Sequence, residues 1–159
     1  MNTLEQGDLG EVSALGWLVS VGASVAVPVG HSPDWDFVAE LDGRLLRVQV
    51  KTCTYVRNER WEIRLCTRGG NQSWNGVVKR MDASRCDYLF VHVGDGRRWF
   101  IPSGRVEGGS LIRLGGPKYA EFEVEPGRPL AQDDADEKPL YNRPRLARGD
   151  VRVVKGIRL

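Results

Sequence analysis

The chain has 159 residues with 23 Lys and Arg against 21 Asp and Glu, giving a net charge of +2, and this length suits one domain with one core. No apolar run of about 18 residues is present, which excludes a membrane-spanning helix, and the N-terminus lacks the pattern of a secretory signal. Three cysteines without a CxxC pair argue against a disulfide framework. We therefore expect a cytoplasmic protein with reduced thiols and no membrane partner.

Charge is distributed unevenly along the chain. Residues 1–43 carry seven acids and no Lys or Arg, whereas residues 44–105 carry thirteen basic residues against five acids. An acidic corner beside a basic surface is the arrangement needed to hold a divalent cation next to a phosphate backbone. A plain mixed surface is the alternative explanation of the same counts.

The first element predicted is a helix from about Leu4 to Gly22. Glu11, Ala14 and Leu18 recur at helical spacing, and Gly22 stands where a helix stop belongs. A strand over Ser24–Val29 follows, with Pro28 near its end, which favours an edge or a bulge.

Further strands are predicted in the rest of the chain. Trp35–Leu41 and Leu45–Thr54 form a hairpin across an Asp-Gly turn. Later strands are predicted at Trp61–Cys66, Asp87–Val93, Arg98–Pro102 and Ala120–Val124, with a polar loop at Arg68–Ser84. This order indicates an α+β (α/β) domain around a mixed sheet, spanning residues 1–125. Residues 126–159 are rich in Pro and charge, and we expect a tail that docks or supports oligomerisation.

The predicted hairpin carries polar residues at positions that could form a site. Arg47, Gln49 and Lys51 alternate with apolar residues and therefore share one face of their strand. Asp36 interrupts the apolar strand before them. A lysine within an apolar strand must extend to water or find a partner.

Glu11 shares the helical stripe of Leu18, so its carboxylate is predicted to face the domain. Burying an unpaired carboxylate costs several kcal/mol, so it needs a cation or good donors. The competing interpretation is an acid at the helix start, with Gly7 and Gly10 placing the true N-terminus nearby.

Oxygen ligands suited to magnesium can be drawn from these segments. Asp36, the side-chain oxygen of Gln49 and a backbone carbonyl near Val50 form such a set. Lys51 would then orient an attacking water or a scissile phosphate.

Three short motifs resemble the PD-(D/E)XK nuclease superfamily. They are GxxGExxAxxxL from Gly7 to Leu18, DWDFV from Asp34 to Val38, and QVKT from Gln49 to Thr52. The resemblance is to bacterial group I intron-associated homing endonucleases in particular, and more distantly to archaeal Holliday junction resolvases. It covers roughly residues 5–123, including the DYLFVHV and WFIP segments.

This resemblance implies a restriction-endonuclease-like core and a metal-dependent endonuclease that hydrolyses DNA with an activated water. Glu11, Asp36, Gln49 and Lys51 would be catalytic. The metal ligands would be Glu11, Asp36, Gln49 and Val50, with Mg²⁺ as cofactor and Mn²⁺ as a substitute. Double-stranded or branched DNA would be the substrate, and a homodimer or homotetramer is expected because duplex cleavage needs two sites. The basic residues expected to bind phosphates are Arg44, Arg47, Arg57, Arg60, Lys79, Arg80 and Arg85.

One departure from the motif matters, because Gln49 stands where the family has an acid. The amide keeps an oxygen ligand but removes one negative charge, so metal affinity should fall. A non-catalytic DNA-binding module on the same fold, a junction-specific resolvase and an unrelated α+β binding protein remain as alternatives. His31 and His92 have no partner at ligand spacing, and His92 is predicted to be a core residue with its hydrogen bonds satisfied.

Overall fold

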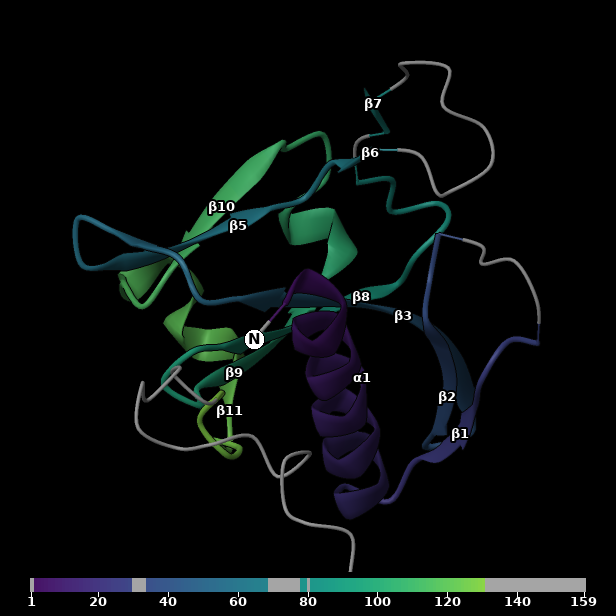
Figure 1. The fold of residues 1–159 in the computed structure, drawn as a ribbon. Coiled ribbons are helices and arrows are strands. Elements are labelled where there is room, and N and C mark those ends of the chain that lie inside the picture. Colours follow the sequence, from purple (N-terminus) through teal and green to yellow (C-terminus); the bar gives the residue numbers. More distant parts are fainter. Residues whose placement is uncertain (1, 30–33, 69–77, 80, 131–159) are drawn as a thin grey trace, which may run out of the picture.

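A computed structural model describes residues 2–29, 34–68, 78–79 and 81–130 (Figure 1). Helix α1 spans Thr3–Ser20. The Asn2 side chain accepts the backbone N–H groups of Leu4 and Glu5, and the Glu5 carboxylate accepts the N–H of Asn2. This capping box satisfies donors that the first turn would otherwise leave unpaired. The predicted helix is therefore confirmed, with its start fixed at Asn2.

The central sheet has six strands in the order β1-β2-β3-β8-β9-β11. Its strands are β1 (Ser24–Ala26), β2 (Phe37–Leu41), β3 (Arg44–Cys53), β8 (Tyr88–Val93), β9 (Arg98–Pro102) and β11 (Glu123–Val124). The β3–β8 pair is parallel and the other pairs are antiparallel, so the sheet is mixed, as predicted. The β2–β3 hairpin turns at Asp42 and Gly43, whose φ values of 52° and 75° are those of a type I′ turn.

A second sheet has the order β10-β5-β4. Its strands are β4 (Val56–Arg57), β5 (Arg60–Arg64) and β10 (Leu111–Leu114). Two short strands, β6 (Thr67–Arg68) and β7 (Val78–Lys79), pair with each other inside the segment predicted to be a polar loop. Residues 69–77 and 80 of that segment lie outside the described residues.

The strand predicted over Ala120–Val124 is wrong for most of its length. Residues Pro117–Phe122 form the 3₁₀ element η2, and only Glu123–Val124 pairs with β9. Tyr119 and Phe122 both pack on the core, and η2 is kinked at Tyr119, whose φ and ψ of −123° and 15° are not helical. A shorter 3₁₀ element, η1 (Ser103–Arg105), follows β9.

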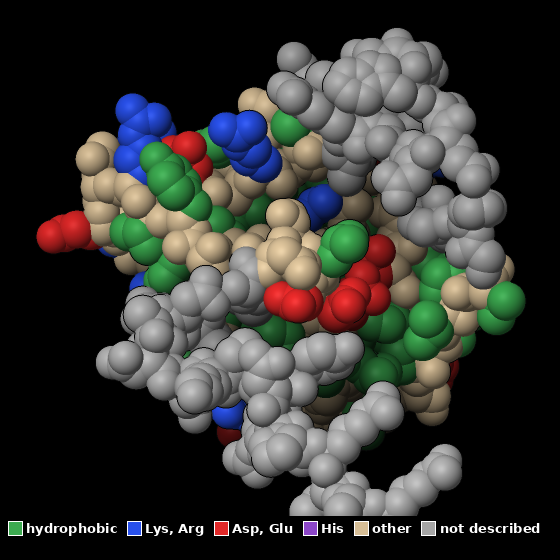
Figure 2. All heavy atoms as spheres, viewed as in Figure 1, with side chains coloured by type: hydrophobic (Ala, Val, Ile, Leu, Met, Phe, Trp, Pro, Cys, Tyr) green, Lys and Arg blue, Asp and Glu red, His purple; other side chains and the backbone are tan. Residues whose placement is uncertain are grey.

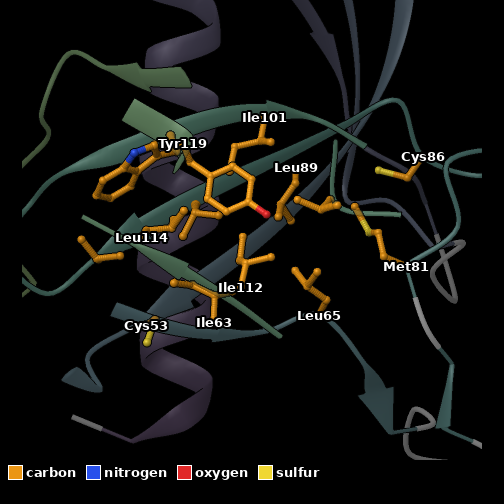
Figure 3. Close-up of a cluster of buried hydrophobic side chains, with 14 residues drawn as sticks. Cys53, Ile63, Leu65, Met81, Cys86, Leu89, Ile101, Ile112, Leu114 and Tyr119 are labelled. Carbon is orange, nitrogen blue, oxygen red and sulfur yellow. The ribbon is translucent and has the colours of Figure 1, made fainter. Parts of the chain in front are cut away.

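Apolar side chains fill both faces of the central sheet. On one face, Leu18 of α1 packs with Val48 and Phe90 in the same buried cluster. On the opposite face, Leu89 packs with Ile63 and other residues of the second sheet and η2 (Figure 3). The molecule therefore has three layers, with α1, the central sheet and the second sheet in that order, and β8 is buried on both sides as its sequence predicts.

The segment 126–130, assigned to the tail from sequence, lies against the β8–β9 turn. The Gly127 N–H donates to the Gly96 carbonyl at 2.8 Å, and the Leu130 N–H donates to the Gly94 carbonyl at 3.1 Å. Leu130 is buried, with 3% of its surface exposed. Residues 131–159 lie outside the described part. Among the described residues, no helix has both the length and the apolar character needed to cross a membrane.

Candidate active site

Asp36 lies directly before β2, which begins at Phe37 rather than at Trp35 as predicted. Its backbone N–H donates to the Val48 carbonyl at 2.8 Å, and its Oδ2 accepts the N–H of Val50 at 2.6 Å. A bond from an amide to an ionised carboxylate is short and strong. Asp36 is thus fixed to β3 through both its backbone and its side chain.

Gln49 and Lys51 lie on the face of β3 opposite α1. Val48 and Val50 pack under the helix, so the alternation of the strand directs the two polar side chains to the other face. Burial lowers the pKa of Lys51, and the negative charge of Asp36 opposes that shift. Lys51 is therefore a partly buried residue whose charge interacts with that of Asp36.

Glu11 does not face the core, contrary to the sequence prediction. The buried residues of α1 are Gly10, Ala14, Trp17 and Leu18. The buried stripe therefore passes through Gly10, the residue before Glu11, and Glu11 itself is exposed. The interpretation as a helix-start acid is also wrong, because α1 begins at Thr3.

The carboxyl of Glu11 nevertheless interacts electrostatically with that of Asp36. Partial burial raises the pKa of Glu11, and the charges of Asp36 and Asp8 raise it further. Burial also raises the pKa of Asp36, although the Val50 N–H and Lys51 act in the opposite direction. Figure 2 shows acidic side chains gathered over the N-terminal end of α1, with basic atoms set behind them. Asp36, directly before β2, is therefore coupled electrostatically to both Glu11 and Lys51, and we call the neighbourhood of these three residues the corner.

The Val50 carbonyl is directed to the same corner by the register of β3. The carbonyls of Val48 and Thr52 both point away from β8, because they accept the Asp36 N–H and the Gln6 Nε2. In a strand, the carbonyl of Val50 lies between them on the same side. Sequence had assigned Val50 as a ligand through this carbonyl, while its N–H holds Asp36.

The donor set of this corner consists of oxygen atoms, and it fits a hard divalent cation. Burial raises the pKa of both carboxyls, and the charge of Asp36 raises that of Glu11 further. A bound cation would stabilise both groups in their charged form. Within the described ranges, no group of three or more His, Cys, Asp or Glu side chains is placed to hold a metal. The set here has two carboxylates, since Gln49 provides an amide in place of a third.

Three residues that sequence reasoning missed hold the helix against this corner. Gln6 Nε2 donates to the Thr52 carbonyl at 3.1 Å. A Cβ added at Gly10 would lie 1.8 Å from Thr52 Oγ1, so only glycine allows this approach. Gly10 precedes Glu11 and Thr52 follows Lys51, so the contact fixes the distance between the two. The available signal was a glycine in a helix interior, where it costs up to about 1 kcal/mol relative to alanine.

The basic residues predicted to bind phosphates are not gathered in one place. Arg47 forms an ion pair with Asp87 at 2.9 Å, and Arg85 forms one with Asp34 at 2.7 Å. Arg60 donates to the carbonyl of Gly115. The remaining predicted residues are Arg44 and Arg57, which are exposed, Lys79, which lies in β7, and Arg80, which lies outside the described residues.

His92 is a core residue, as predicted, with 3% of its surface exposed. Its Nε2 lies 3.0 Å from the Arg128 carbonyl. Its Nδ1 has no hydrogen-bond partner among the described atoms, so the prediction of full satisfaction is confirmed for one nitrogen only. His31 lies outside the described residues.

Comparison with solved structures finds a similar fold in "The structure of a bacterial homing endonuclease: I-Ssp6803I". The match has a TM-score of 0.65 at 20% identity and covers 77% of this chain and 89% of that one. No curated protein matches the chain. A family model described as PD-(D/E)XK endonuclease matches residues 1–113, which include α1, the β2–β3 hairpin and the corner that unites Glu11, Asp36 and Lys51. The chain belongs to the PD-(D/E)XK endonuclease family.

Proposed function

We propose that this protein is a metal-dependent endonuclease that hydrolyses phosphodiester bonds in DNA. The observation that carries the proposal is the placement of Asp36, whose carboxylate accepts the Val50 N–H and interacts electrostatically with Lys51. Family membership supports the nuclease activity. The metal dependence rests on the oxygen donors of the corner.

Glu11 and Asp36 would supply the charged ligands, and Gln49 and the Val50 carbonyl would supply neutral oxygens. A divalent cation such as Mg²⁺, when bound, acidifies water and offsets the charge of the phosphodiester. The rigid hydrogen bond to Asp36 means that this ligand needs little reorganisation. Binding should be weaker than in a site with three carboxylates, so we expect a requirement for millimolar Mg²⁺ or Mn²⁺.

Lys51 would act on the phosphate and on the attacking water. Its ammonium donates hydrogen bonds and carries no acceptor, so it can hold a water oxygen and a non-bridging phosphate oxygen. Preorganised donors aimed at developing charge contribute on the order of 10²–10³ in rate. Water is the nucleophile in this scheme, and no covalent intermediate with the protein is needed.

The test is a supercoiled-plasmid nicking assay with Mg²⁺, with Mn²⁺ and with EDTA. Wild type should nick in either metal and not in EDTA, and Lys51→Ala should not nick. Lys118→Ala is the matched control, because Lys118 is an exposed lysine of η2 whose ammonium lies 5.1 Å from the Tyr119 ring. Equal nicking by wild type and Lys51→Ala would refute the assignment.

Gln49 favours a second candidate, a non-catalytic DNA-binding module. With two carboxylates in place of three, the corner could have lost metal binding while the fold kept its affinity for DNA. Absence of nicking in every metal, with retained binding of linear duplex, would select this candidate. A junction resolvase would instead cleave four-way junctions in preference to linear duplex.

A cleaving enzyme of this kind needs two sites to cut both strands, so we infer a homodimer or a larger homo-oligomer. Light scattering after size exclusion measures the mass directly. A monomer that only nicks would contradict this inference while leaving the nuclease proposal intact.

A further inference from the structure

The second sheet has one face on the core and one face outward. Ile63 of β5 and Ile112 of β10 are buried and lie opposite each other. Alternate residues of a strand point to opposite faces and cross-strand partners share a face. The outward residues on these strands include Leu111, the cross-strand partner of Arg64. The others are charged, and we call them the arginine face: Arg57, Arg60, Glu62, Arg64 and Arg113.

The arginine face is strongly positive, with four arginines against one glutamate. Glu62 already forms an ion pair, since its Oε2 lies 3.3 Å from Arg113 Nε, and its side chain is only 11% exposed. Arg57 and Arg60 are direct cross-strand partners, and like charges in that position destabilise a sheet. Arg60 also donates to the Gly115 carbonyl, and a bound polyanion would relieve the repulsion between the two arginines.

The arginine face lies close to the candidate active site along the chain. Arg57 is six positions after Lys51, so their Cα atoms lie within about 20 Å even for a fully extended chain. This is shorter than one turn of duplex DNA, about 34–36 Å. Figure 2 shows basic side chains over β5 and β10 on the same face of the molecule as the acidic group at the N-terminal end of α1.

We propose that the arginine face binds the phosphate backbone of duplex DNA beside the scissile bond. The proposal rests on the proposed function, because the duplex at this face is the substrate of that corner. It assigns binding to the exposed Arg57 and Arg64, and to Arg113, whose 3.3 Å pair with Glu62 is longer than the 2.9 Å pair of Arg47 with Asp87 and the 2.7 Å pair of Arg85 with Asp34. Arginine contacts to phosphates position a duplex without reading its sequence.

The test is binding of a fluorescein-labelled linear duplex of mixed sequence, measured by anisotropy in EDTA over a series of salt concentrations. Each arginine that neutralises a phosphate contributes about 0.9 to the slope of log K against log salt. The double variant Arg57→Gln/Arg64→Gln should weaken binding about tenfold or more and make the slope shallower by about 2. Arg113→Gln should make it shallower by about 1.

Arg105→Gln is the matched control for Arg113→Gln. Both arginines pair with a glutamate, and their side chains are 60% and 56% exposed, but Arg105 lies in η1 rather than in the second sheet. Arg105→Gln should leave affinity and slope unchanged. Thermal unfolding of each variant should match wild type, since all four substitutions are at exposed side chains.

The outcomes separate this inference from the proposed function. If wild type binds duplex but does not nick plasmid, and the arginine variants lose affinity, the arginine face stands while the nuclease activity is wrong. If wild type nicks plasmid and the arginine variants bind with wild-type affinity and slope, the arginine face is wrong while the activity stands. A wild-type protein that does not bind duplex in EDTA at low salt would also overturn the inference.

Discussion

Strands β3 and β8 are neighbours, parallel and paired residue by residue, yet they differ in what they present to one face of the sheet. Gln49 lies opposite Leu89 and Lys51 lies opposite Val91. Leu89 and Val91 are fully buried, so β8 shows what this face favours when packing alone decides. The polar residues of β3 are costly to the fold, and the proposed function gives them a role beside Asp36.

The largest expected effect comes from making β3 resemble β8. Lys51→Met keeps the length of the side chain and removes the charge, so nicking should fall at least about a hundredfold. Stability in EDTA should rise, because burial lowers the pKa of Lys51 despite Asp36 and the charged form is therefore disfavoured by the fold. Plasmid nicking and thermal unfolding measure the two effects. Lys118→Met, which should change neither, is the control, and a less stable Lys51→Met protein would contradict the argument.

The next effect tests how the helix is held against β3. Gly10→Ala places a methyl group 1.8 Å from Thr52 Oγ1, so α1 must move away and carry Glu11 with it. We expect a loss of about 1–3 kcal/mol in stability and a fall in nicking of up to about a hundredfold.

The double variant Gly10→Ala/Thr52→Ala provides the decisive control for that effect. It removes the hydroxyl and leaves the Thr52 Cβ, which lies 3.1 Å from the added methyl. Nicking and the half-saturating Mg²⁺ concentration should return toward wild type. Failure of the second substitution to rescue nicking would mean that the glycine acts in another way.

A smaller effect should follow from restoring charge to β3. Gln49→Glu adds a third carboxylate to the corner, so the half-saturating Mg²⁺ concentration should fall by several-fold or more in this poorly solvated site. Leu45→Glu is the comparison, since it adds the same charge to β3 at a residue that is 73% exposed and is not a proposed ligand. Titrations of nicking against Mg²⁺ compare the variants, and an unchanged midpoint for Gln49→Glu would argue against a metal at this corner.

The smallest effect concerns His92, the polar residue of β8. Burial and then Arg98 lower its pKa from the ordinary 6.5, while the Arg128 carbonyl and Asp95 oppose the shift. The unfolded chain therefore takes up the proton first, and the stability from neutral His92 is present above about pH 6.5 and lost as pH falls through the folded pKa. As the pH is lowered from about 7.5 to about 5, the free energy of unfolding measured by urea titration should fall less for His92→Gln than for wild type. Parallel pH dependences would contradict this assignment.

The sequence predicted those parts of the molecule that depend on local periodicity. Alternation along Leu45–Thr54 correctly separated Lys51 from Val50, and the Asp-Gly turn fixed the hairpin. Glu11 was wrongly predicted to face the core, because helical spacing identifies an apolar stripe but not which residue lies at its centre. That depends on the close approach of Gly10 to Thr52. The partners of Arg47 and Arg85 could not be predicted, because Asp87 and Asp34 reach them through tertiary contacts. The strand predicted over Ala120–Val124 was wrong in its first part, because the aromatic residue Phe122 also fits the 3₁₀ element η2.

The parallel pairing of β3 with β8 has a consequence for how this protein can change. Parallel neighbours require a long crossover, and here it runs through residues 54–87, which include β4 and β5. Buried residues of the crossover, such as Ile63 and Leu65, are fixed by the core, but exposed positions such as Arg57 and Arg64 can change their charge while both strands keep their register. The outer surface of the crossover can therefore change while the arrangement of Asp36 and Lys51 stays as it is.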